Sequence, residues 1–204
     1  MDVGVLGGTF DPIHLGHLKI AEEARQQLGL GRVLFVPAGR PALKTDRIIT
    51  PAHHRTEMVR LAIAGKPYLE LSSLEVDRLG VSYTVDTLAS LQKQFGAKAK
   101  FYLIAGMDSL LDLPEWREAA KLVRLCRLVV FPRTGYNKPD LKALEAFVPG
   151  LTRSLVLLDI EPVDISSTDI RGRLARGLPI HEMVPKAVEG YIEKYKLYRQ
   201  CLWG

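Results

Sequence analysis

Cysteine is scarce in this chain of 204 residues, which has only Cys126 and Cys201, far apart. Their spacing matches no metal or redox motif, so we expect two free thiols in a reducing cytosol. No apolar run approaches the roughly 20 residues that a membrane helix needs. The first residues also lack the basic region and long apolar stretch of a signal peptide. The sequence therefore predicts a cytoplasmic protein without a membrane partner.

Runs of basic residues are also absent, although the net charge is +5 and the pI is about 9.2. The positive charges are scattered among acidic residues, as in residues 22–25 and 115–118. Scattered charge is typical of a solvated surface, so we expect no nucleic-acid partner. The positive balance instead suits a small anionic substrate such as a polyphosphate.

Short apolar runs alternate with amphipathic stretches along the chain. We expect strands at residues 3–6, 32–36, 68–71, 100–104, 127–131 and 154–158. Helices are expected at residues 16–28, 51–64, 84–95, 115–124, 139–147, 167–176 and 185–196. Apolar strands separated by helices indicate a parallel sheet that is covered on both faces. The prediction is an α/β fold with a doubly wound parallel sheet, one domain over residues 1–204, in which residues 165–204 form a small C-terminal helical part.

An unusual loop follows the first strand and opens the first helix, with the sequence GGTFDPIHLGH at residues 7–17. Gly7 and Gly8 leave room for a phosphate to approach the backbone, and the helix start offers N–H groups and a positive dipole end. His14 and His17 are three residues apart, so both can donate hydrogen bonds from one face. The loop is neither a dinucleotide fingerprint nor a Walker A loop. A zinc site, which would need further ligands, and two purely structural histidines are the alternatives.

A second loop, DISSTDIR at residues 164–171, follows the last strand and starts another helix. Ser167 or Thr168 could be a plain helix N-cap, with Arg171 on the surface. Beside the first loop, hydroxyls and an arginine at a helix start instead indicate a second phosphate clamp, because Arg171 is about one turn into the helix.

These two loops resemble the paired HxGH and ISSTxxR motifs of the nucleotidyltransferase superfamily. Within it, the chain is most similar to bacterial nicotinate mononucleotide adenylyltransferases. Four further segments carry this resemblance: residues 82–88 (SYTVDTL), 106–116 (GMDSLLDLPEW), 131–135 (FPRTG) and 184–198 in the tail. The chain departs from the family at residues 41–44 (PALK), where Lys44 is kept but Leu43 stands at the usual histidine position.

The resemblance implies a Rossmann-like fold and a reaction of NAD biosynthesis. The adenylyl group of ATP is transferred to nicotinate mononucleotide, which gives deamido-NAD (nicotinate adenine dinucleotide) and pyrophosphate. Mg²⁺ would be carried by the ATP phosphates, since no acidic cage is visible. The acceptor phosphate is already a nucleophile, so the protein would position two anions and stabilise developing charge. The sequence leaves a monomer or a homo-oligomer open.

The resemblance also assigns the site residues. The catalytic residues would be His14, His17, Lys44 and Arg171. The residues that bind ATP would be Gly7, Gly8, Thr9, Phe10, His14, His17, Gly106, Asp108, Ile165, Ser166, Ser167, Thr168 and Arg171. The acceptor would be bound by Lys44, Tyr83, Thr84, Asp108, Trp116 and Arg133. Trp116 would stack on the pyridine ring, although an aromatic residue at a helix start is also typical of a core, and Asp108 fits a helix N-cap equally well.

Other functions stay open at this point. A different adenylyltransferase, such as the pantetheine-phosphate enzyme, and a cytidylyltransferase would share the two motifs. A non-catalytic nucleotide sensor would bind ATP without releasing pyrophosphate. A nucleic-acid-binding protein would show salt-sensitive binding, which the scattered charge does not favour.

Overall fold

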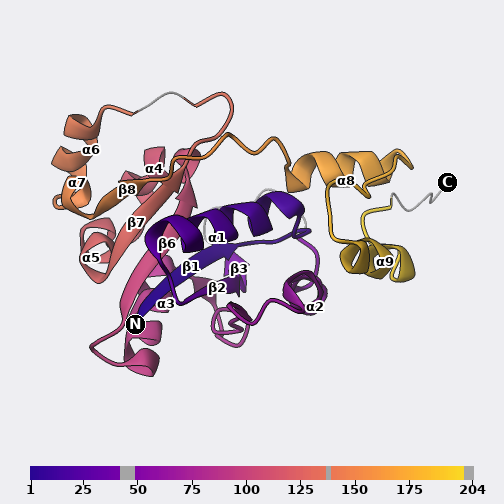
Figure 1. Ribbon diagram of the computed structural model, residues 1–204, viewed down its shortest axis with the longest axis horizontal. Helices are drawn as coiled ribbons and strands as arrows, with labels where there is room; N and C mark the ends of the chain where they lie inside the picture. The colour runs from indigo at the N-terminus through magenta and orange to yellow at the C-terminus, as the bar shows by residue number, and fades with distance from the viewer. Residues whose placement is uncertain (42–48, 137–138, 200–204) are drawn as a thin grey trace.

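A parallel sheet forms the centre of the computed structural model, which describes residues 1–41, 49–136 and 139–199. Within these residues the sheet has six strands in the order β4-β2-β1-β6-β7-β8, and each neighbouring pair is parallel. The strands are β1 (Asp2–Gly8), β2 (Arg32–Pro37), β4 (Leu69–Leu71), β6 (Lys100–Gly106), β7 (Cys126–Phe131) and β8 (Leu155–Leu157). The predicted α/β fold with a doubly wound parallel sheet is confirmed (Figure 1).

Seven helices of the described residues correspond to the predicted ones. They are α1 (Leu15–Leu28), α2 (Ala52–Ile63), α3 (Thr84–Phe95), α5 (Ala119–Leu125), α6 (Leu141–Phe147), α8 (Ser167–Ala175) and α9 (Lys186–Lys194). The predicted helix at residues 115–124 begins only at Ala119, because Leu113–Glu115 form the 3₁₀ helix η1 and Glu118 has a positive φ of 52°. The helix predicted from residue 139 begins at Leu141, because the Asp140 carboxylate caps it by accepting from two backbone N–H groups.

Five short elements of the described residues were not predicted. They are η1, the strands β3 (Arg40–Pro41) and β5 (Val81–Ser82), which pair with each other, and the helices α4 (Met107–Leu111) and α7 (Leu151–Ser154). A helix of about one turn is too short to show a hydrophobic period. A two-residue strand is determined by its partner and not by its own sequence.

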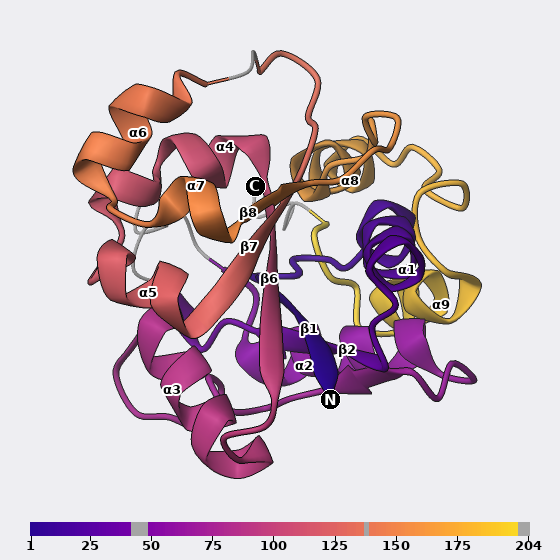
Figure 2. The same ribbon diagram turned by 60° about the vertical axis from the view of Figure 1, so that its left-hand side comes forward.

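The sheet separates two apolar clusters, because successive side chains of a strand point to opposite faces. On β2, Val33 and Phe35 belong to one cluster, whereas Leu34 and Val36 belong to the other. The first cluster contains the apolar faces of α1, α2, α8 and α9, and the second contains those of α3 to α7. Figure 2 shows α1, α8 and α9 on the right of the sheet and α3, α5 and α7 on its left.

The strand order reverses between β1 and β6. The chain moves outward from β1 through β2 to β4, crosses to β6 on the other side of β1, and continues outward to β7 and β8. In doubly wound sheets, ligands bind beyond the carboxyl ends of the strands at this switch point. The segments that follow Gly8 and Gly106 therefore mark the place where a ligand is expected.

The C-terminal helices share the core of the rest of the chain. Ile170 on α8, together with Val188 and Ile192 on α9, is at most 1% exposed and lies in the same cluster as α1 and α2. The division of the chain into one domain stays a prediction, since these contacts show packing only. Within the described ranges, no helix has the length and apolar character to cross a bilayer, and the cytoplasmic location also stays a prediction.

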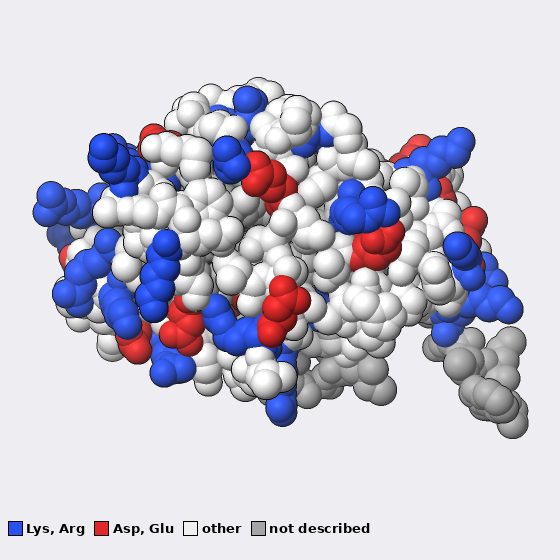
Figure 3. All heavy atoms as spheres, turned by 90° about the horizontal axis from the view of Figure 1, so that it is seen from below, with Lys and Arg blue, Asp and Glu red and all other residues white. Residues whose placement is uncertain are grey.

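The surface mixes charges of both signs. On the face shown in Figure 3, Lys and Arg side chains lie beside Asp and Glu over much of the molecule, with more basic side chains toward one end. Cys126 is a free, buried thiol, and burial raises its pKa to about 12. Cys201 lies outside the described residues.

Replacing Leu122 tests the second apolar cluster. Leu122 on α5 is 0% exposed, so Leu122→Ala should lower the free energy of unfolding by about 2–5 kcal/mol through lost burial and a cavity. Leu79 is 98% exposed, and Leu79→Ala should change that free energy by less than about 0.5 kcal/mol. Urea denaturation followed by circular dichroism measures both, and equal effects of the two variants would contradict this packing.

Candidate active site

The first loop is folded tightly beneath the carboxyl end of β1. Phe10 is 1% exposed and has a left-handed φ of 48°, which is unusual for a residue with a side chain. Its ring meets the His17 ring edge-on at 5.0 Å and the Phe35 ring at 5.7 Å. A Cβ on Gly7 would meet no protein atom within 4 Å, so the protein leaves space beside this glycine.

His14 and His17 lie on one face of the start of α1, as their spacing predicts. The two rings are stacked with their centroids 3.6 Å apart. The His14 backbone N–H donates to His17 Nδ1 at 3.2 Å. Because Nδ1 accepts this hydrogen bond, the ring proton of neutral His17 is on Nε2. His17 therefore has the tautomer that presents an N–H at its outer nitrogen.

Burial keeps the His14 ring uncharged. His14 is 6% exposed, and this burial, helped by the charge of Arg133, lowers its pKa from 6.5 to about 3. At neutral pH the ring can donate a hydrogen bond to a phosphoryl oxygen, but it adds no positive charge. Positive charge near the His14 ring comes from Arg133, which lowers the His14 pKa, and from the start of α1.

The second loop contacts the first through backbone carbonyls. Ser167 Oγ donates to Pro12 O at 2.9 Å, and Arg171 NH1 donates to Asp11 O at 2.7 Å. Arg171 NH2 also donates to Thr168 Oγ1 at 3.1 Å. The structure thus brings the two predicted loops together. The role of each residue toward a substrate stays a prediction.

Ser166, and not its neighbours, caps helix α8. The Ser166 side chain accepts from Asp169 N at 3.1 Å. The alternative in which Ser167 or Thr168 is the plain N-cap is therefore wrong, and their hydroxyls have other contacts. Ile165, a predicted ATP-binding residue, packs its side chain against the first apolar cluster.

Asp108 and Arg133 form an ion pair beyond the ends of β6 and β7. Arg133 NH1 lies 2.5 Å from Asp108 Oδ2. A Cβ on Gly106 would lie 2.3 Å from Asp108 Oδ1 and 2.9 Å from Arg133 Cδ, so this pair requires a glycine. Gly106 is itself the N-cap residue of α4, and the alternative of Asp108 as a helix N-cap is therefore wrong. Because Arg133 lowers the pKa of His14, its charge also acts on the first loop.

Tyr83 and Thr84, two predicted acceptor-binding residues, lie at the start of α3, and within the described residues no hydrogen bond joins them to the two loops. Tyr83 is the N-cap residue of this helix and Thr84 its first residue. The Arg117 guanidinium lies over the Tyr83 ring, 4.6 Å from its centroid, and 3.6 Å from Asp86 Oδ2. Arg117 was missed by the sequence analysis, because a charged residue in a mixed-charge stretch gives no signal of a stacking partner.

Trp116 packs against the protein, as the alternative of a core residue expects. Its side chain is partly buried against the second apolar cluster. Stacking on a pyridine ring stays a prediction. Lys44 and Leu43 lie outside the described residues, so the predicted role of Lys44 is untested.

Arg55 and Tyr198 were also missed. Arg55 is 2% exposed and donates to Thr9 O in the first loop at 2.8 Å. Tyr198, near the end of the described chain, donates from its hydroxyl to Asp11 Oδ1 at 2.8 Å. A signal for Arg55 was present: it shares the spacing of Met58, Val59 and Ala62, the buried face of α2.

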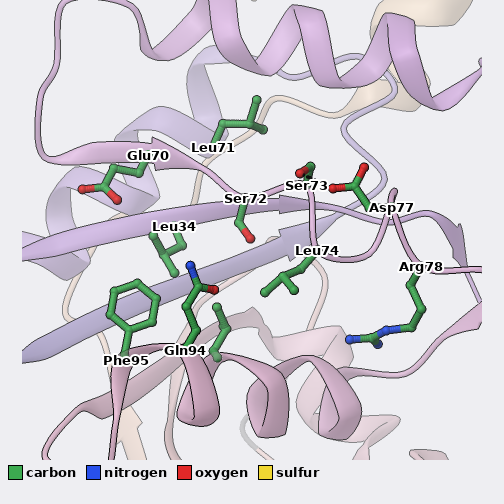
Figure 4. A pocket seen from close by; sticks show the side chains of 11 residues that line it. Leu34, Glu70, Leu71, Ser72, Ser73, Leu74, Asp77, Arg78, Gln94 and Phe95 are labelled. Carbon is green, nitrogen blue, oxygen red and sulfur yellow. Dashed lines mark hydrogen bonds between the residues drawn. The ribbon is translucent and has the colours of Figure 1, made fainter.

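A pocket of about 440 Å³ lies away from these loops, between α3 and the segment after β4 (Figure 4). Its polar side chains contact one another or neighbouring residues: Ser73 Oγ donates to Asp77 Oδ2 at 2.5 Å, and Arg78 NH2 donates to Ser90 Oγ at 3.1 Å. None of the predicted site residues lines it. The candidate site is therefore defined by the two loops and not by this pocket.

A doubly wound sheet with two such loops meeting at its switch point is typical of a nucleotidyltransferase. The family model described as "Cytidylyltransferase-like" matches residues 5–173. A protein of Dehalococcoides mccartyi is 46% identical over 98% of each chain, and one of Roseiflexus sp. (strain RS-1) is 50% identical over 97% of this chain and 98% of its own. Both are named "Probable nicotinate-nucleotide adenylyltransferase". The chain belongs to the nicotinate-nucleotide adenylyltransferase family.

Solved structures share the fold. The nicotinic acid mononucleotide adenylyltransferase of Plasmodium falciparum complexed with NaAD has a TM-score of 0.77 to this chain, with 22% identity and 97% of each chain covered. The same protein complexed with APC gives the same TM-score. At this identity the likeness concerns the arrangement of the elements.

The buried imidazole of His14 predicts a pH-dependent stability. Between about pH 3 and 6.5 the unfolded chain binds a proton at His14 that the folded chain does not. The free energy of unfolding therefore falls as the pH falls through this window. His14→Gln should show a smaller loss than the wild-type protein between pH 6.5 and 4 in urea denaturation. Parallel pH profiles of the two proteins would show that His14 is not held neutral.

Proposed function

We infer that this protein transfers the adenylyl group of ATP to nicotinate mononucleotide, which gives deamido-NAD and pyrophosphate in NAD biosynthesis. The relatives of that name are 46% and 50% identical over nearly the full chain. The observation that carries the proposal is the contact between the loops, in which Ser167 and Arg171 hold the carbonyls of Pro12 and Asp11. This contact joins two phosphate-binding helix starts into one place for a triphosphate.

The reaction needs positioning more than it needs a protein nucleophile. A phosphate oxygen of the acceptor attacks the α-phosphorus of ATP in line, a new P–O bond forms, and the bond to the bridging oxygen breaks as pyrophosphate leaves. His14 and His17 Nε2 would donate to the oxygens around the α-phosphate. Ser167, Thr168 and Arg171 would hold the outgoing pyrophosphate. A guanidinium has five N–H donors, so one arginine can hold a loop and contact a phosphate together.

Mg²⁺ would come with the ATP phosphates. In the described part of the chain, no three His, Cys, Asp or Glu side chains gather as metal ligands. Phosphate oxygens of ATP and water would hold the ion, as is usual for Mg²⁺ at phosphate sites. The ion would neutralise phosphate charge, while the protein residues orient the triphosphate.

The acceptor would lie toward α3 and the Asp108–Arg133 pair. The N–H groups of Tyr83 and Thr84 at the start of α3 are suited to a carboxylate, which would favour nicotinate over nicotinamide. Arg133 and Lys44 would attract the acceptor phosphate. Trp116 would supply an aromatic surface for the pyridine ring. The Plasmodium falciparum structure complexed with NaAD shows that this fold accommodates such a dinucleotide.

Replacing His17 tests the chemistry of the first loop. His17→Ala removes a donor near the α-phosphate, so kcat should fall about 10²- to 10³-fold. Pyrophosphate release with ATP, Mg²⁺ and nicotinate mononucleotide measures this, and circular dichroism checks the fold. The matched control is His181→Ala, which removes an exposed histidine outside the loops and should keep wild-type turnover. Near-normal turnover of His17→Ala would contradict the mechanism.

Product analysis tests the acceptor. Wild-type protein with ATP and Mg²⁺ should form deamido-NAD from nicotinate mononucleotide at a higher kcat/KM than it forms NAD from nicotinamide mononucleotide. With 4′-phosphopantetheine, no adenylylated product should appear. Chromatography of the products identifies each dinucleotide. ATP binding without pyrophosphate release from any acceptor would make the protein a sensor and would overturn the proposal.

A further inference from the structure

Arg55 is a charged side chain at the N-terminal end of the buried, otherwise apolar face of α2. It lies on α2, is 2% exposed and is the largest of the fully buried side chains. Its guanidinium donates to three backbone carbonyls: from NH1 to Thr9 O at 2.8 Å, from Nε to Thr50 O at 2.8 Å, and from NH2 to Gly39 O at 3.3 Å. Thr9 belongs to the first loop, Thr50 lies just before α2, and Gly39 follows β2. One side chain therefore ties together three stretches of backbone.

A buried carboxylate accompanies this charge. Asp11 is 1% exposed, and its Oδ1 accepts the hydroxyl proton of Tyr198 at 2.8 Å. Burial lowers the pKa of Arg55, while the charge of the nearby Asp11 carboxylate acts in the opposite direction. An arginine stays protonated in proteins, so the charges of Arg55 and Asp11 compensate each other. Without Arg55, the buried Asp11 carboxylate would lose a nearby positive charge.

The contact with Thr9 O also orients the backbone of the loop. In a trans peptide the C=O and N–H point in opposite directions, so drawing the Thr9 carbonyl toward Arg55 turns the Phe10 N–H away from it. Phe10 follows with its positive φ of 48°, a conformation that persists only where the surroundings hold it. A second tie runs from Ala38 N to Gly8 O at 2.8 Å.

We propose that Arg55 is a positioning residue for adenylyl transfer, which holds residues 9–11 of the first loop in the shape that places His14 and His17 against the triphosphate. This inference rests on the proposed function. Arg55 is too deeply buried to touch a substrate, so it acts through the loop backbone. The Tyr198 hydroxyl assists by donating to the Asp11 carboxylate, which makes the C-terminal segment a part of the same arrangement.

Arg55→Lys is the first test, because a lysine keeps the charge but cannot span three carbonyls with a planar fork. The variant should fold, and its kcat should fall about 10²-fold, as expected for misplaced catalytic groups. Its KM for nicotinate mononucleotide should stay close to the wild-type value, since the acceptor side is untouched. Arg60→Lys is the matched control on the same helix, where Arg60 pairs with Glu57 at the surface, and it should keep wild-type kinetics.

Chemical rescue separates positioning from folding. Arg55→Ala leaves a cavity of the shape of a guanidinium, and millimolar guanidinium chloride should raise its kcat, whereas the same concentration of urea should not. The kcat of Arg60→Ala should not respond to either. Tyr198→Phe should lower kcat too, and its effect combined with Arg55→Lys should be smaller than the product of the single effects, because the two residues act on one carboxylate.

Two outcomes would overturn the inference: a wild-type kcat in Arg55→Lys, or a folded Arg55→Ala whose lowered kcat does not respond to guanidinium. If Arg55→Ala does not fold, Arg55→Lys decides alone. The wild-type protein in the same assay tests the proposed function separately. If it forms no dinucleotide, direct titration with Mg²⁺-ATP still tests the inference: binding should be weaker in Arg55→Lys than in Arg60→Lys, and equal binding would overturn it.

Discussion

The site depends on side chains that hold backbone carbonyls of the first loop. Arg171 and Ser167, from the start of α8, hold the carbonyls of Asp11 and Pro12, and Arg55 on α2 holds that of Thr9. Because the C=O and N–H of a trans peptide point in opposite directions, the Thr9 and Pro12 carbonyls that face these donors turn the following N–H groups away from them. Because the loop is held by side chains from α2 and α8, its shape depends on parts of the chain that are distant in sequence.

The electrostatics of the region follow from burial. His14 is neutral because the ring is removed from water and lies near the charge of Arg133. Asp11 is a buried acid of the first loop. The charge of Arg55 is near its carboxylate, and the Tyr198 hydroxyl donates a hydrogen bond to it. His14 is therefore a neutral donor at neutral pH, and the buried Asp11 of the first loop lies near the charge of Arg55.

The fold places this arrangement at the point where the strand order reverses. The ends of β1 and β6 are adjacent in the sheet, so the segments after Gly8 and Gly106 lie next to each other although the chain between them forms a whole half of the molecule. The Asp108–Arg133 pair adds the end of β7 to the same edge. Gly106 is required there because any Cβ would collide with both partners. The segments after β1, β6 and β7 thus lie at one edge of the sheet. The start of α8 contacts the first of these segments.

Local sequence was sufficient for the strands of the sheet, most of its helices and the two loops, because hydrophobic period and loop chemistry are properties of adjacent residues. It did not reveal the short helix α4, the Ser166 cap, the Asp108–Arg133 pair or the buried role of Arg55. Helix α4 and the Ser166 cap are local but too short to show a hydrophobic period. The ties to the first loop depend on atoms that are far apart in the chain: Thr9 lies 46 residues from Arg55, and Asp11 lies 187 residues from Tyr198. Only the tertiary structure decides which distant carbonyl faces a buried donor, because desolvation makes that pairing obligatory only once the chain has folded around it.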